Sequence, residues 1–234
     1  GGLSASLYKR GMKFVHVPTS LMGMTDAAIG GKTAVNTAKG KNLIGCFKQP
    51  DLVIIESLFL TTLNNHEYIS AFAEIIKHAL ISDKDYFNLL IKNSKTLLAR
   101  QNNKKYFDIL NIVIAKSIEI KTNIVNQDEH ENLGVRHQLN FGHTIGHAIE
   151  AASDYKISHG YAVAIGIVFE SFISLQMNIL KQREFESIVK IIKMFKLDDY
   201  LRPELFSSVF LDEFYEAISR DKKNSDKKVK MVLL

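Results

Sequence analysis

The chain has 234 residues, 46% of them hydrophobic and 24% charged, which is enough to bury a sizeable core in one large or two modest domains. A net charge of +5 suits small anionic molecules as much as nucleic acid, but no aromatic-interleaved basic stripe is present, and we expect a small-molecule ligand and no nucleic acid partner. No apolar run approaches the roughly 20 residues that span a bilayer, so we expect no membrane segment. One cysteine, Cys46, excludes an internal disulfide and indicates a reducing compartment, the cytoplasm.

The first 56 residues have the features of an α/β segment. Residues 3–10 are expected to end a helix at Gly11, and residues 13–17 to form a strand that ends at Pro18. Residues 19–50 are expected to be irregular and, because long loops without their own structure are uncommon, functional. Residues 52–55 are apolar throughout, which predicts a buried strand of a parallel sheet covered on both faces. The abrupt start at Gly1-Gly2 and the apolar end at Val232-Leu233-Leu234 suggest a fragment.

The sequence pattern changes at about residue 61, and residues 61–211 predict an all-α domain. Apolar residues recur with helical periodicity, and strand signals are almost absent. The clear interruption is a charged segment at residues 127–132. The helical stretches lie at residues 67–80, 86–98, 105–126, 162–180 and 183–195.

A histidine cluster stands out within this helical region. If residues 143–152 are helical, His143 and His147 lie one turn apart, with Cβ atoms roughly 5–6 Å from each other. Gly142 and Gly146 each cost about 1 kcal/mol relative to alanine in a helix, which indicates that another element approaches closely. With His159, the spacing predicts a metal site completed by a distant carboxylate. The alternative is helix packing with histidines hydrogen-bonded to their neighbours.

Glu74 is the best candidate for that carboxylate. It lies in the apolar stretch at residues 72–76, so we expect it to be largely buried, and a buried carboxylate needs a partner or a metal. Lys77 follows at the i+3 position, and the alternative is an intrahelical ion pair worth about 0.5 kcal/mol or less.

Two glycine–lysine segments and one arginine are candidate anion-binding groups. Gly30-Gly31-Lys32-Thr33 is not a P-loop, because Asp26 stands where the first glycine is required. Together with Gly40-Lys41-Asn42 it still offers backbone N–H groups and cations to an anion, the alternative being two solvated turns. Arg136, just before the histidine segment, would suit a phosphate, or is an ordinary exposed arginine.

Taken in order, these segments resemble the 3-dehydroquinate synthase family along the whole chain. The resemblance implies the C-terminal part of a Rossmann-like α/β NAD-binding domain at residues 1–56 and an all-α metal- and substrate-binding domain at residues 57–234. The matching segments are Lys9-Arg10-Gly11, Val17-Pro18-Thr19-Ser20-Leu21, Asp26, Gly30-Gly31-Lys32-Thr33-Ala34-Val35-Asn36, Gly40-Lys41-Asn42-Leu43-Ile44-Gly45, Gln49-Pro50, Ala73-Glu74-Ile75-Ile76-Lys77, Asp128-Glu129, Arg136, Leu139-Asn140-Phe141-Gly142-His143-Thr144-Ile145-Gly146-His147-Ala148-Ile149-Glu150, His159-Gly160 and Asp221-Lys222-Lys223.

The resemblance also implies a role for individual residues. The metal, zinc or cobalt, would be held by Glu74, His143 and His159. His147, Glu131 and Lys77 would be catalytic, the first two through proton transfer. NAD would contact Thr19, Ser20, Lys32, Lys41, Phe59, Leu60, Thr61 and Thr62. The substrate would contact Arg10, Asp26, Lys32, Asn42, Lys77, Lys121, Arg136, Asn140 and Lys223.

The reaction implied is the conversion of a seven-carbon keto-acid phosphate to 3-dehydroquinate and phosphate, in which NAD is used catalytically, by a cytoplasmic homodimer. Tyr161 departs from the family, which has Glu there. Ser158-His159-Gly160 is similar to a sister group, the 2-deoxy-scyllo-inosose synthases, which remain the alternative enzyme. A truncated, inactive copy that binds only metal or a partner is the non-enzyme alternative.

Overall fold

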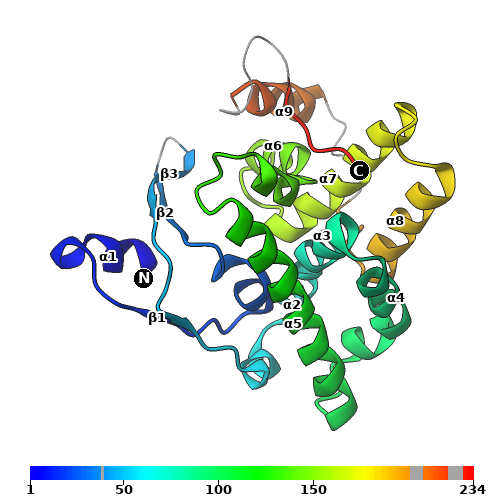
Figure 1. Cartoon of the computed structure of the whole chain (residues 1–234). Helices are drawn as coiled ribbons and strands as arrows, with labels where there is room; N and C mark the ends of the chain where they lie inside the picture. Colours follow the sequence, from blue (N-terminus) through cyan, green and yellow to red (C-terminus); the bar gives the residue numbers. More distant parts are fainter. Residues whose placement is uncertain (38–39, 201–207, 221–228) are drawn as a thin grey trace.

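The structure is a computed structural model that describes residues 1–37, 40–200, 208–220 and 229–234. A small N-terminal part leads into a larger body of helices (Figure 1). None of the described helices is both long and apolar enough to cross a membrane. The N-terminal part contains α1 (Gly2–Leu7), η1 (Tyr8–Arg10), β1 (Val15–His16), η2 (Gly23–Ala27), β2 (Lys32–Thr37), β3 (Gly40–Phe47), β4 (Leu52–Val53) and η3 (Ser57–Thr62).

The expected parallel pairing is present, although the strands are short. β1 pairs with β4 in parallel, with Val15 opposite Leu52. The expectation of a strand covered on both faces is wrong for the described chain, because Leu52 and Ile54 are 53% and 46% exposed.

The expectation that residues 19–50 are irregular is also wrong. β2 and β3 form an antiparallel hairpin with Thr33 opposite Cys46, and residues 23–27 form a π-helical turn, η2. Thr33, Val35 and Ile44 are strand formers, but the flanking glycines conceal their pattern in the sequence.

The predicted all-α region is confirmed. Asn64, Asp83 and Asn103 cap three of its helices by accepting a hydrogen bond from the backbone N–H three residues on, which satisfies donors that lack an intrahelical partner. The elements are α2 (Asn65–Ser70), α3 (Phe72–Ser82), α4 (Lys84–Ala99), α5 (Lys104–Gln127), η4 (Val135–Asn140), α6 (His143–Ala152), α7 (His159–Gln176), α8 (Gln182–Met194) and α9 (Ser208–Arg220).

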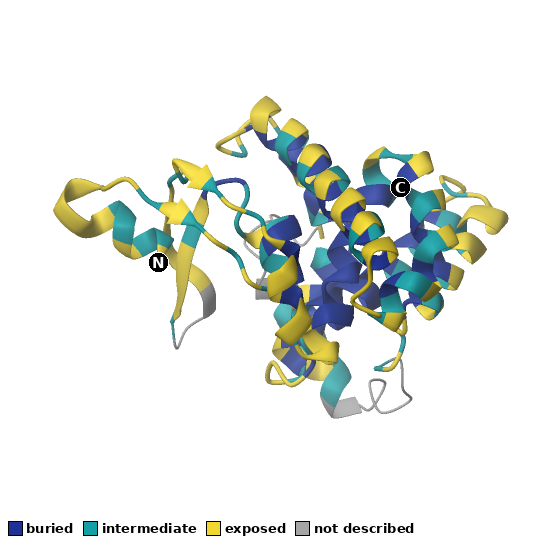
Figure 2. Cartoon of the chain, turned by 90° about the horizontal axis from the view of Figure 1, so that it is seen from below, coloured by how far each residue is buried: buried dark blue, intermediate teal, exposed yellow. Residues whose placement is uncertain are grey.

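The core lies in the helical body, whereas α1 has no buried residue and the hairpin is largely exposed (Figure 2). Phe72, Ile75 and Ile76 on α3 are fully buried at its centre. Leu21 and Met24 are fully buried in the same cluster, so η2 is anchored against the helices through α3 and α5. This anchoring carries Asp26, on η2, to the helical body.

Helices α6 and α7 pack with their backbones unusually close, as the glycine spacing predicts. A Cβ atom on Gly146 would lie 3.1 Å from Val163 Cα. A Cβ atom on Gly166 would overlap the carbonyl oxygen of Gly142. Gly142 has a φ of +79°, a backbone conformation that favours glycine. The close contact sets His143, at the start of α6, beside His159, at the start of α7.

This packing predicts a graded effect of adding a methyl group. We expect Gly166→Ala to lower the free energy of unfolding by about 2–3 kcal/mol, because overpacking forces the backbone of α6 away. Gly146→Ala should cost about 1 kcal/mol or less, since its neighbours need to move only slightly and alanine favours the helix. Urea unfolding of both variants measures the difference, and a larger loss for Gly146→Ala would contradict the described contact.

Candidate metal centre

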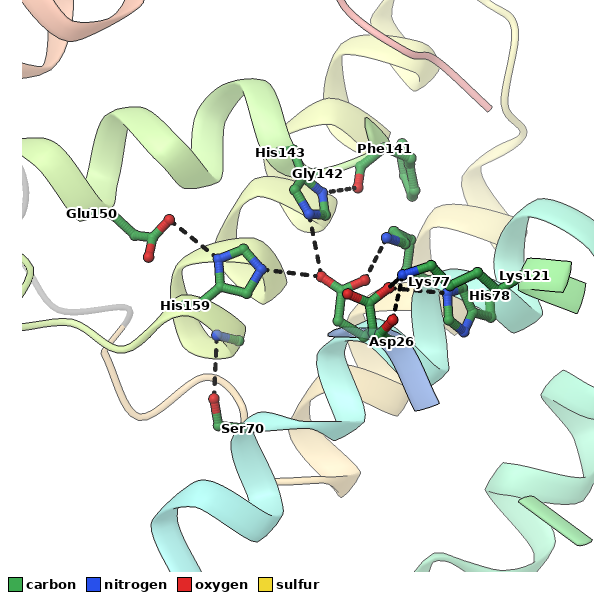
Figure 3. A network of polar contacts seen from close by, with 12 residues as sticks. Asp26, Ser70, Lys77, His78, Lys121, Phe141, Gly142, His143, Glu150 and His159 are labelled. Carbon is green, nitrogen blue, oxygen red and sulfur yellow. Dashed lines mark hydrogen bonds and ion pairs between the residues drawn. The ribbon is translucent and has the colours of Figure 1, made fainter. Parts of the chain in front are cut away.

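Glu74, His143 and His159 converge on one point from three helices. Glu74 Oε1, on α3, lies 3.3 Å from the Nε2 atom of His143 and 3.3 Å from the Nε2 atom of His159 (Figure 3). The Glu74 side chain is fully buried, as the sequence predicts, while His143 and His159 are 12% and 35% exposed. Two imidazole nitrogens and one carboxylate oxygen around one point are a donor set that suits a transition metal, with the more exposed side left open.

The other nitrogen of each ring is held by a hydrogen-bond acceptor. His143 Nδ1 lies 3.2 Å from the carbonyl oxygen of Phe141, and His159 Nδ1 lies 3.2 Å from Glu150 Oε2. A carbonyl oxygen and a carboxylate can only accept, so each Nδ1 carries the hydrogen. Both Nε2 atoms are therefore the ones that face Glu74 and that would be available to a metal ion.

Charge at the centre is balanced in the protein without metal. Burial alone would raise the pKa of Glu74, but the charges of Lys77 and His143 hold it well below its usual value. Burial lowers the pKa of His159, yet hydrogen bonds to Glu150 and Glu74 outweigh it and raise that pKa to about 10. Metal binding here therefore requires the loss of a proton from His159.

Two lysines lie behind the carboxylate. Lys77 forms an ion pair with Glu74, and both side chains are almost completely buried. Lys121 Nζ, on α5, lies 2.5 Å from Asp26 Oδ1 and 2.6 Å from the Asp26 carbonyl oxygen. The structure thus brings together Asp26, Lys77 and Lys121, three of the predicted substrate contacts, beside the predicted metal ligands (Figure 3).

His78, for which the sequence predicts no role, belongs to the same polar cluster. It is fully buried, with Nδ1 3.1 Å from Ser117 Oγ and Nε2 3.8 Å from Asp26 Oδ1. Ser117 also contacts Tyr86, whose hydroxyl donates to the carbonyl of Val113 at 2.7 Å. Burial and the nearby charge of Lys77 lower the pKa of His78 to about 3, so the ring is neutral at physiological pH.

A second polar cluster ties the β2–β3 hairpin to residues 128–140. Lys32 Nζ lies 2.5 Å from Glu131 Oε2, and Asn140 Nδ2 lies 3.4 Å from Glu131 Oε1. Arg136 is 3% exposed and donates to the carbonyl oxygens of Glu129 at 2.7 Å and Gly30 at 2.8 Å. Four predicted site residues, Lys32, Glu131, Arg136 and Asn140, thus meet here, and Arg136 is not the exposed arginine of the alternative reading.

The remaining predicted site residues lie on other elements. Arg10 ends η1 and is exposed, and Asn42 is exposed on β3, where it lines a hollow of about 430 Å³ with Lys32. His147 is exposed on α6, and its ring centroid is 5.2 Å from that of His143 and 6.0 Å from that of His159.

The predicted NAD contacts flank the helical body. Ser20 Oγ accepts a hydrogen bond from the Gly23 N–H at 3.2 Å, just after the exposed Thr19. Phe59, Thr61 and Thr62 are exposed on η3. Leu60 on the same element is 1% exposed, and its carbonyl oxygen accepts a hydrogen bond from Arg100 at 2.6 Å, so the structure does not present it as a contact. The side chain of Lys41 and the whole of Lys223 lie outside the described residues.

Two buried carboxylates besides Glu74, neither of them among the predicted site residues, support the centre. Glu150 holds His159, as described above. Glu170 Oε2 accepts a hydrogen bond from the Gly142 N–H at 2.6 Å, and Oε1 accepts one from the Ile145 N–H at 3.2 Å, so it caps the start of α6 from α7. An acidic residue inside the apolar stretch at 161–173 is the signal in the sequence that would have identified Glu170.

Comparisons with protein families match both parts of the chain. A family model described as 3-dehydroquinate synthase N-terminal matches residues 1–70, and one described as 3-dehydroquinate synthase C-terminal matches residues 71–224. A 3-dehydroquinate synthase of Campylobacter jejuni subsp. doylei is 44% identical over 235 residues, which is 100% of this chain and 64% of that protein. One from Sulfolobus acidocaldarius is 41% identical over 222 residues, covering 95% of this chain and 61% of its own length. The chain therefore spans less than two thirds of these relatives.

Solved structures with the same fold are sugar phosphate cyclases. A 2-epi-5-epi-valiolone synthase from Streptomyces hygroscopicus, with NAD+ and Zn2+ bound, has a TM-score of 0.86 at 28% identity and covers 99% of this chain and 62% of its own. A 2-deoxy-scyllo-inosose synthase complexed with carbaglucose-6-phosphate, NAD+ and Co2+ has a TM-score of 0.81 at 24% identity, covers 100% of this chain and 62% of its own, and shows the fold alone. The likeness confirms the predicted fold class.

The buried neutral His78 predicts a specific acid sensitivity of the fold. Its pKa falls from 6.5 in the unfolded chain to about 3 in the folded protein, so the unfolded state binds the extra proton between these values. As pH falls below 6.5, stability is lost at about 1.4 kcal/mol per unit, or about 2 kcal/mol at pH 5. Urea unfolding at about pH 7.5 and pH 5, with chelator present, should show a smaller loss for His78→Gln than for the unsubstituted chain. Equal losses would contradict a neutral buried His78.

Proposed function

Because this chain belongs to the 3-dehydroquinate synthase family, we propose that it forms the metal- and anion-binding part of an enzyme with that activity. The reaction is the conversion of 3-deoxy-D-arabino-heptulosonate 7-phosphate to 3-dehydroquinate and phosphate, a carbon–oxygen lyase step of the shikimate pathway. The convergence of Glu74, His143 and His159 beside Lys77 and the Asp26–Lys121 pair is the observation that carries the proposal.

The proposed metal ligands are Glu74, His143 and His159, with zinc or cobalt as the ion. Their fit is supported by the two Nε2 atoms that face one carboxylate oxygen, each with its Nδ1 already bound elsewhere. Three protein ligands leave a position for a ligand oxygen, as in catalytic zinc sites. A zinc ion bound there supplies a Lewis acid for substrate hydroxyl and carbonyl groups.

The cations of the two polar clusters are proposed to bind the anionic ends of the substrate. Lys77 and Lys121 lie beside the metal ligands, and each already pairs with a carboxylate, so they are held in place before the substrate arrives. Lys32, Asn42, Arg136 and Asn140 would contact the substrate from the hairpin and the adjacent segment. Arg10 and Lys223 complete the proposed set of substrate contacts. Asp26 would orient Lys121 and accept a hydrogen bond from a substrate hydroxyl group.

Proton transfer is proposed for His147 and Glu131. His147 is exposed one turn after His143, so its ring can reach a ligand at the metal without being a metal ligand itself. Glu131 lies between Lys32 and Asn140, where a substrate would displace its carboxylate toward the reacting atoms.

The organisation of the protein follows from the same proposal. NAD would bind at Thr19, Ser20, Lys32, Lys41 and residues 59–62. Residues 1–56 would belong to the NAD-binding domain and residues 57–234 to the metal- and substrate-binding domain.

The exposed apolar side chains of Val35 and Ile44 on the hairpin support a homodimer, and the single free cysteine supports a cytoplasmic location.

The substrate assignment is tested by phosphate release. We expect release from the heptulosonate phosphate in the presence of NAD and zinc, and little from glucose 6-phosphate, which lacks the carboxylate that a lysine would bind. Since the chain is shorter than its relatives, the assay uses it joined to the portion of the Campylobacter jejuni protein that it does not match. Release from glucose 6-phosphate alone would favour the 2-deoxy-scyllo-inosose synthase alternative, and release from neither would favour the inactive copy.

The proposed split between His143 and His147 gives a second test. His143→Ala should lose both zinc and activity, because it removes a ligand. His147→Ala should keep zinc and lose 10²-fold or more in kcat, the usual effect of removing a proton-transfer group. Zinc content and kcat of the same joined protein measure both outcomes. Loss of zinc from His147→Ala would instead make His147 a ligand.

A further inference from the structure

Glu150 is a buried carboxylate with no role in the proposed chemistry. It lies on α6, seven residues after His143, and is 2% exposed. Burying a carboxylate is expensive unless it is paired, so a role is expected for it. Its Oε2 atom lies 3.2 Å from Nδ1 of His159, across the gap between α6 and the start of α7 (Figure 3).

The contact determines which nitrogen of His159 is available. The carboxylate accepts the Nδ1 hydrogen, so Nε2, which lies 3.3 Å from Glu74 Oε1, is the nitrogen directed into the centre. The same contact restricts rotation of the ring, because Nδ1 must stay directed at α6. His159 is the most exposed of the three ligands, at 35%, and so receives the least restraint from packing.

The two histidines are held by acceptors of different charge. His143 donates to a neutral carbonyl oxygen of its own chain segment, that of Phe141. His159 donates to an anion on a different helix. A carboxylate behind an imidazole makes the ring a stronger electron donor and aligns it with the ion, and loss of such a partner weakens metal binding about 10–100-fold.

We propose that Glu150 is a positioning residue for the metal ligand His159, which orients the ring and strengthens its bond to the ion without touching the ion itself. The inference rests on the proposed metal site at Glu74, His143 and His159. It assigns Glu150 a function distinct from that of the ligand Glu74 and from that of Glu170, which accepts hydrogen bonds from the backbone N–H groups of Gly142 and Ile145.

A second cation site at Glu150 is the competing reading, since His147, Glu150 and His159 also present donor atoms within 4.8 Å of one another. Such a site would need Nδ1 of His159 without its hydrogen. Two cations would then bind the two nitrogens of one imidazole ring and repel each other across it. The hydrogen bond to Glu150 favours the positioning role.

The test is zinc binding by the purified 234-residue chain, measured by competition with a chelator, together with the visible spectrum of the Co2+-loaded chain. We expect Glu150→Gln, which keeps the size and hydrogen-bond acceptor but removes the charge, to weaken zinc binding 10–100-fold and to shift the cobalt bands. Glu150→Asp, which keeps the charge but is too short to reach the ring, should weaken binding similarly. Ser153→Ala is the matched control, because Ser153 Oγ donates to the Glu150 carbonyl oxygen at 3.0 Å and supports the same helix end. It should leave affinity and spectrum unchanged.

Action through His159 is tested by a double substitution. In a His159→Ala background, Glu150→Gln should cause no further loss of zinc affinity. The inference is overturned if Glu150→Gln and Glu150→Asp bind zinc as tightly as the unsubstituted chain does. It is also overturned if Ser153→Ala loses as much zinc affinity as these two variants, or if the double variant binds zinc more weakly than His159→Ala alone. Binding of two zinc ions, the second lost in Glu150→Gln, would also overturn it in favour of the second cation site. Failure of the proposed metal site is separate, since zinc binding would then survive Glu74→Ala.

Discussion

A fully buried carboxylate, that of Glu74, is the constraint on which the rest of the structure depends. An ionised carboxylate in the interior is stable only if other groups replace the water it has lost. Lys77 does so from the same helix, and His143 and His159 do so from two others. The helical body must therefore hold α3, α6 and α7 within side-chain reach of one point, and the glycine contacts between α6 and α7 make this approach possible.

The same requirement extends to the N-terminal part of the chain. Asp26 lies on η2, outside the helical body in sequence, yet Leu21 and Met24 are buried in its core. These apolar side chains bring a second carboxylate and its partner Lys121 beside the first. Glu74 and Asp26 thus each have an ammonium partner, Lys77 and Lys121, so the negative charges of the two neighbouring carboxylates are balanced by two positive ones. His78 is neutral, which preserves the charge balance of the cluster, because a protonated ring would add a buried positive charge with no further carboxylate in the described cluster to pair it.

Part of this centre could be predicted from local spacing, which marked the histidine cluster, whereas the choice of His143 and His159 over His147 came from the family resemblance. The helix predicted at residues 143–152 is α6, and the apolar neighbours of Glu74 correctly indicated its burial. The hairpin was missed because glycines interrupt its strand pattern. The partners of Arg136 and His78 were missed for another reason. Arg136 binds the carbonyl of Gly30, 106 residues away, and His78 contacts Ser117, 39 residues away, and no periodicity encodes such pairs.

Because Lys32 is paired with Glu131, an anion can bind this lysine only by replacing a carboxylate. Lys32 is not a vacant positive charge, since its ammonium group already contacts a carboxylate at 2.5 Å. An arriving anion exchanges one negative partner for another, and the free-energy gain is only the difference between the two. An anion that made only this one contact would gain little from the exchange. A molecule with several anionic or hydroxyl groups would add a further gain at each additional contact, so an exchange of this kind favours ligands that make many contacts at once.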